Sequence, residues 1–124
     1  MTLNQILLVG IGGFLGSVTR FAVYFFLNPS QLLKYPLATV VVNALGCFAA
    51  GSLWARVNAQ FTSDQPLVLF LSVGFFGAFT TFSALGIDTL VFVKQDEVAR
   101  ALIHVAMNLV LGIGAAFFGR WLFQ

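Results

Sequence analysis

Charged residues are scarce in this chain. Lys, Arg, Asp and Glu make up only 8% of its 124 residues, whereas a soluble domain averages about 25%. Six basic and four acidic side chains cannot cover a globule of this size with water-facing groups, so we expect the surrounding solvent to be a lipid bilayer. The net charge of +2 and the lack of any basic stretch argue against a nucleic-acid partner.

Residues that carry chemistry are also few. The chain has one cysteine and one histidine, which excludes an intrachain disulfide and a zinc site. It has no Ser-His-Asp set, no phosphate-binding loop and no dinucleotide fingerprint in a soluble context. We therefore expect no enzymatic activity and no catalytic residues. The sequence also implies no protein partner other than further copies of this chain.

Long hydrophobic runs are abundant, because 60% of the residues are hydrophobic. Four runs each reach the roughly 20 residues needed to cross a bilayer core of about 30 Å. Only helices satisfy their own backbone groups there, so each run predicts a helix. The polar breaks are too short for an extramembrane domain, which predicts one transmembrane domain over residues 1–124. The expected spans are 3–27, 36–57, 66–93 and 98–123.

The first run predicts a retained membrane helix. It lacks the basic n-region of a signal peptide, and it is longer than a hydrophobic h-region of about 7–15 residues.

The third run is irregular at its centre, which reads GFFGAFTTFS from Gly74 to Ser83. Glycine, serine and threonine are weak helix formers. One interpretation is a helix broken at mid-membrane, which commonly forms an ion site. The other is a glycine-lined packing face whose hydroxyls bond back to their own helix. The sequence leaves both open.

Basic residues are spread almost evenly over the two sides of the predicted bundle. One side has Arg56 and Arg120, and the other has Lys34, Lys94 and Arg100. So weak a bias permits insertion in both orientations. Four helices can hardly enclose a pore alone, and small residues along them permit close helix approach. We therefore expect an oligomer, most simply a twofold dimer, which the weak charge bias would allow to be antiparallel.

Polar side chains inside a membrane are functional candidates by default. Arg20 lies inside the first span and either snorkels to the headgroups or supplies a fixed positive charge to a water-filled vestibule. Asn43 lies at the middle of the second span and is either interhelical glue or a donor to an anion. Thr39 lies one turn before Asn43 on the same face, so the pair predicts a polar track.

Four further candidates lie in the third and fourth spans. His104 and Asn108 are one turn apart, and His104 is either a structural histidine or a proton relay. Asp88 pairs with a cation or lines a vestibule. Phe82 stands among hydroxyl residues, and the positive edge of its ring offers a small anion a weak contact. Weak contact suits conduction, because an ion must leave a site as well as enter it.

Several motifs together resemble the Fluc/CrcB family of fluoride channels. They are the GFFGAFTTFS run at 74–83, Gly12-Gly13-x-x-Gly16-x-x-x-Arg20, Thr39-x-x-x-Asn43-x-x-Gly46, and Asn108. The resemblance covers nearly the full chain in order and spacing. It implies a dual-topology homodimer in the cell inner (plasma) membrane. It also implies two pores that passively export fluoride and lower its cytoplasmic concentration.

The resemblance also implies roles for individual residues. The backbone carbonyls of Gly77 and Thr80 would hold a structural sodium ion at the dimer interface. Phe82 would be a pore-facing ring and Asn43 a fluoride donor. The implied fluoride pathway consists of Phe82, Asn43, Thr39, Thr81, Ser83, Arg20 and Asn108.

The chain departs from the family pattern at three places. Leu85 stands where a second phenylalanine is usual, and leucine has no positive ring edge, so the second ring-lined fluoride site is in question. Leu111-Gly112 replaces a common Gly-Ser, and Asp88 replaces a common glutamate.

Two rival functions are considered. One is a small dual-topology, four-helix, proton-coupled transporter of cationic compounds, which relies on a carboxylate in its first helix. Residues 3–27 contain no Asp or Glu, which argues strongly against it. The other is a non-conducting accessory subunit.

Overall fold

The computed structural model describes residues 2–27, 36–57 and 65–124. The predicted polar break near Asn28 and most of the one after Val57, together with Lys34, lie outside these ranges. Helices are the only regular elements in the part described. They are α1 (Leu3–Leu27), α2 (Leu37–Arg56), α3 (Pro66–Val68), the π-helical η1 (Leu69–Phe76), α4 (Gly77–Phe79), α5 (Phe82–Lys94) and α6 (Val98–Phe123).

Four helical segments in the described ranges are long and apolar enough to cross a bilayer. They are Leu3–Leu27, Leu37–Arg56, Pro66–Lys94 and Val98–Phe123. Their ends agree with the predicted spans to within one residue, so the prediction of four apolar helices is confirmed. The chain is a multi-pass, all-helical membrane protein whose outer solvent is lipid.

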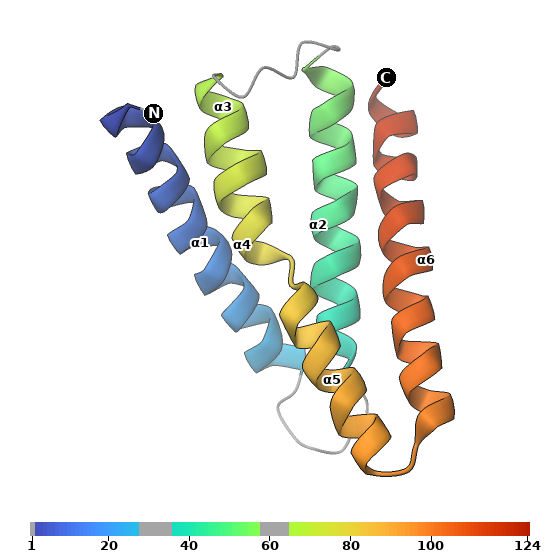
Figure 1. The fold of residues 1–124 in the computed structure, drawn as a ribbon. Coiled ribbons are helices and arrows are strands. Elements are labelled where there is room, and N and C mark those ends of the chain that lie inside the picture. The colour runs from blue at the N-terminus through green and yellow to red at the C-terminus, as the bar shows by residue number, and fades with distance from the viewer. Residues whose placement is uncertain (1, 28–35, 58–64) are drawn as a thin grey trace.

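The helices stand side by side, with both termini at the same end of the bundle (Figure 1). The end of α2 and the start of α3 lie at that end too, and the turn between α5 and α6 lies at the other. The principal packed pairs are α2 with α6, α1 with η1, and α5 with α6. This order brings α1, α2, α5 and α6 around the link between α4 and α5.

Glycines set the approach of α1 to η1. Gly12 and Gly16 are buried on α1, and a Cβ at either position would collide with the carbonyl oxygen of Phe70 or Phe75, respectively. Since backbone meets backbone here, no larger residue fits without displacing a helix. The predicted close approach of glycine-rich helices is present, and it fixes the height at which Arg20 emerges from α1.

The backbone leaves the helical conformation at Thr80 and Thr81. Thr80 has φ −75° and ψ 158°, and Thr81 has φ −150° and ψ 118°. Thr81 then caps α5, because its Oγ1 accepts a hydrogen bond of 3.1 Å from the Ala84 amide. Figure 1 shows the resulting link between α4 and α5. The hydroxyl of Thr80 bonds back to the Phe76 carbonyl at 2.8 Å.

Candidate functional site

Side-chain amides from α2 and α6 hold the link between α4 and α5. Asn43 Nδ2 donates to the carbonyl of Thr81 at 3.1 Å and to Asn108 Oδ1 at 2.8 Å. The Thr81 amide donates to Asn43 Oδ1 at 2.8 Å. Asn108 Nδ2 in turn donates to the His104 carbonyl at 2.9 Å. Both backbone groups of Thr81, which lies outside the helices, are thus satisfied by the Asn43 side chain of a neighbouring helix.

These contacts bear on the two interpretations of Asn43. An asparagine amide has two donor hydrogens, and the structure directs Nδ2 at two acceptors within the chain. This geometry is that of interhelical glue. Donation to an anion would require one of the two bonds to be exchanged, so the role of Asn43 as a fluoride donor stays a prediction.

The carbonyls of Gly77 and Thr80 lie where the regular helical bonding stops. In a continuous helix the Thr81 amide would donate to the Gly77 carbonyl, but here it donates to Asn43 Oδ1. The Thr80 carbonyl accepts a hydrogen bond of 3.4 Å from Arg20 Nη1. The Thr80 carbonyl thus lies at the α4–α5 link beside the Arg20 guanidinium, and the Gly77 carbonyl lies at the start of α4.

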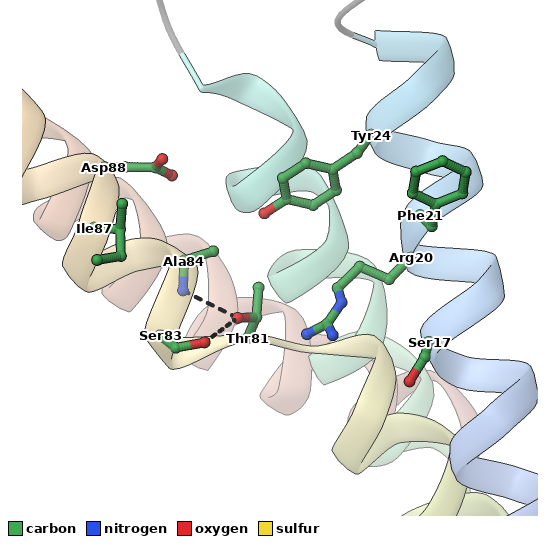
Figure 2. A pocket seen from close by; sticks show the side chains of 9 residues that line it. All are labelled: Ser17, Arg20, Phe21, Tyr24, Thr81, Ser83, Ala84, Ile87 and Asp88. Atoms are coloured by element: carbon green, nitrogen blue, oxygen red, sulfur yellow. Dashed lines mark hydrogen bonds between the residues drawn. The ribbon is translucent and has the colours of Figure 1, made fainter.

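A cavity of about 610 Å³ opens between α1 and α5. Figure 2 shows Arg20 reaching from α1 toward Thr81, with Tyr24 and Asp88 at the far side. The hydroxyls of Thr81 and Ser83 lie 3.1 Å apart on its wall. The full lining is Ser17, Arg20, Phe21, Tyr24, Thr81, Ser83, Ala84, Ile87 and Asp88.

Thr39 lies at the centre of a polar chain between helices. It is fully buried, its Oγ1 is 2.8 Å from the Tyr24 hydroxyl, and it donates to Asp88 Oδ2 at 2.6 Å. Sequence reasoning missed Tyr24. Two features could have indicated it: Tyr24 lies one turn after Arg20, and it is a tyrosine in a helix whose other aromatic residues are phenylalanines.

Phe82 and Leu85 lie on a second, smaller cavity of about 250 Å³. Residue Phe82 is 83% exposed, whereas Leu85 is only 6% exposed. Asn43, Thr81 and Asn108 also line this cavity. Phe82 therefore lies next to the polar α4–α5 link, and most of its side chain faces outward from the single chain.

The predicted pathway residues thus divide between the two cavities. Arg20 and Ser83 line the first, Phe82, Asn43 and Asn108 line the second, and Thr81 lines both. Thr39 lies behind the first cavity, joined to it through Asp88. In the part of the chain that the structure describes, no cluster of three His, Cys, Asp or Glu side chains could hold a metal ion. A cation here would depend on backbone oxygens.

Comparisons with known proteins place this arrangement in a family. Residues 7–120 match the family described as CrcB-like protein, Camphor Resistance (CrcB). The protein named fluoride-specific ion channel FluC from Idiomarina loihiensis is 35% identical over 98% of this chain and 97% of its own length. A protein of the same name from Thermus thermophilus is 39% identical over 96% and 93%, respectively. With these matches spanning nearly all four helices, the chain belongs to the CrcB-like family.

Proposed function

We propose that this chain forms a fluoride-selective channel that passively exports fluoride and so lowers its cytoplasmic concentration. The names of the relatives support a fluoride channel, and they describe no enzyme. The observation that carries the proposal is the cavity at the α4–α5 link, where the guanidinium of Arg20 lies near the hydroxyls of Thr81 and Ser83. These groups can all donate hydrogen bonds to a small anion.

The second cavity supplies contacts of a different kind. The edge of the Phe82 ring carries partial positive charge and would hold a bare anion weakly. The amides of Asn43 and Asn108 lie beside it. A path that alternates strong donors near Arg20 with weak contacts at Phe82 lets an ion both enter and leave.

We further propose an antiparallel homodimer with dual topology in the inner (plasma) membrane. Phe82 supports this, because a residue that is 83% exposed cannot select an ion while it faces lipid. A second copy would close the pore around it. The weak charge bias also supports it, since both insertion orientations are then accessible. A break of the third span at mid-membrane belongs to the same proposal.

We also propose that the carbonyls of Gly77 and Thr80 hold a sodium ion at the dimer interface. Sodium is a hard cation that binds oxygen ligands, and helix ends with freed carbonyls favour cations. The Gly77 carbonyl has lost its regular helical donor to Asn43. Two oxygens per chain make an incomplete shell, so a twofold partner would supply the rest. Bound sodium would add a fixed positive charge at the link.

Fluoride efflux from liposomes that hold the purified protein tests the channel. A fluoride electrode records release, chloride release is measured under the same gradient, and protein-free liposomes serve as the control. We expect fast fluoride release without chloride release. No fluoride release from a folded dimer, with none restored by Leu85→Phe, would overturn the proposal.

The rival proton-coupled transporter gains no support from the structure. The helix that should hold its carboxylate, α1, contains no Asp or Glu. Transport of a cationic compound that stops when the proton gradient is collapsed would favour that rival instead.

A further inference from the structure

His104 and Asp88 form a pair that the proposed channel mechanism does not yet use. His104 is the single histidine of the chain and is fully buried on α6. Its Nε2 lies 3.4 Å from Asp88 Oδ2 on α5, whose side chain is 23% exposed. Asp88 lines the same cavity as Arg20 (Figure 2). The pair therefore connects the interior of α6 with the wall of the cavity.

Hydrogen bonds identify Asp88 as the acceptor end of a chain of hydroxyls. Thr39 donates its hydroxyl hydrogen to Asp88 Oδ2 at 2.6 Å. Since a threonine hydroxyl has one hydrogen, the 2.8 Å contact with Tyr24 is then donated by Tyr24. Both donors point toward the carboxylate. For the carboxylate form of Asp88, whose oxygens only accept, this arrangement supplies hydrogen-bond donors.

A negatively charged Asp88 would repel an anion that enters the cavity. The cavity then has one fixed positive charge at Arg20 and one fixed negative charge at Asp88, and an entering anion is attracted by the first and repelled by the second. A positive charge next to Asp88 would cancel the repulsion. Histidine is the side chain that ordinarily gains or loses charge between about pH 5 and pH 8.

We propose that His104 is a positioning residue for anion entry: when protonated, it neutralises Asp88 and so leaves Arg20 as the net charge of the cavity. This inference rests on the proposed channel function. Each element packed near His104 contributes identifiable groups. Asp88 comes from α5, the uncharged Thr39 from α2, and Arg20 and Tyr24 from α1 across the cavity.

Other neighbours of His104 do not compete for this role. Arg100, one turn earlier on α6, is paired with Glu97 at 2.9 Å on the exposed side of the helix. Phe92 presents an aromatic ring at 5.9 Å and carries no charge. In the described ranges, Asp88 is thus a charged group that the structure places 3.4 Å from the His104 ring.

Fluoride current through the protein in a planar bilayer tests the proposal. Current excludes the neutral acid HF, which crosses lipid without moving charge. At equal fluoride-ion concentration, we expect the wild-type current at about pH 5.5 to be at least roughly three times the current at about pH 7.5. His104→Gln cannot take up a proton and should abolish the difference. Equal wild-type currents, or a difference that persists in His104→Gln, would overturn the proposal.

Substitution of the carboxylates provides a matched pair. Asp88→Asn should raise the current at neutral pH toward the acidic value, because the repulsive charge is gone. Asp96→Asn removes a carboxylate at the α5–α6 turn, where a positive φ of 59° suits asparagine, and should leave the current unchanged. An Asp88→Asn current that matches wild type at neutral pH would contradict the proposal.

A second measurement does not depend on conduction. The single histidine can be titrated by NMR in detergent micelles, in wild type and in Asp88→Asn. The two midpoints should differ, because an opposite charge within about 4–6 Å favours the charged form of the histidine. Absence of any current would count against the channel, whereas coincident histidine titrations would overturn the inference itself.

Discussion

Asn43 and Thr81 are joined by two hydrogen bonds that run in opposite directions. The amide nitrogen of Asn43 donates to the Thr81 carbonyl at 3.1 Å, and the Thr81 amide donates to Asn43 Oδ1 at 2.8 Å. One side chain of α2 thereby satisfies both backbone groups of a residue that lies between two helices. The pairing resembles a single rung of a β-ladder, made by a side chain in place of a strand.

Asn43→Ala should impair both folding and conduction. It leaves a buried backbone amide and carbonyl without partners, which costs about 1–3 kcal/mol for each unsatisfied group. We expect slower fluoride efflux from liposomes and a lower unfolding temperature in detergent. Ser52→Ala is the control, since Ser52 only bonds back to Phe48 at 2.8 Å within α2. Wild-type efflux in Asn43→Ala would make Asn43 structural glue alone.

Phe82→Ile should abolish fluoride efflux while the protein remains a folded dimer. Phe82 is 83% exposed, so the fold of one chain does not depend on it, and isoleucine lacks the positive ring edge. Efflux is measured with the fluoride electrode, and size-exclusion chromatography checks assembly. Phe117→Ile is the matched control, because Phe117 is 67% exposed on α6. Unchanged efflux in Phe82→Ile would remove Phe82 from the pore.

Gly12→Ala should destabilise the protein although it adds only a methyl group. The new Cβ would collide with the Phe70 carbonyl, and overpacking of this kind costs about 1–3 kcal/mol. The expected result is a lower midpoint in thermal unfolding of the detergent-solubilised protein. Gly10→Ala on the same helix meets nothing within 4 Å and should not lower the midpoint, because alanine favours a helix more than glycine does. Equal midpoints for the two variants would contradict the packing of α1 on η1.

Leu85→Phe should increase fluoride efflux. Leu85 is 6% exposed and lines the cavity of about 250 Å³ shared with Phe82 and Asn43, so a ring at this position has space to enter. It would add a second positive edge next to the polar link. Efflux rates of the variant and the wild type are compared at equal dimer content. A rate that falls in a well-folded variant would show that Leu85 is adapted to its site.

The spans were predictable because membrane insertion is dominated by the length of apolar runs. Pro66 marks the first residue of α3, since proline needs no donor there. Polar residues inside the spans also had to find partners, which made Asn43, Asn108 and Asp88 identifiable as candidates from their positions in apolar runs.

Partner choice was not predictable, because it depends on helix rotation and height. The sequence places Thr39 and Asp88 on different helices with no indication that they bond, and it left Tyr24 unnoticed among the aromatic residues. The outward direction of Phe82 likewise follows from the local path of Thr80 and Thr81. Periodicity cannot report this path, because both residues leave the helix.

The π-helical segment η1 sets the rotation of everything after it. A π-helical turn is wider than an α-helical turn and contains more residues over the same length of helix axis. This lets Gly74 face α1 while Thr81 still reaches Asn43. Each residue of an α-helix rotates the chain by about 100° around the helix axis. If η1 became a regular α-helix, the residues after it would therefore point in a different direction around that axis. The eight residues of η1 thus set how the α4–α5 link is rotated relative to the glycine face that packs on α1.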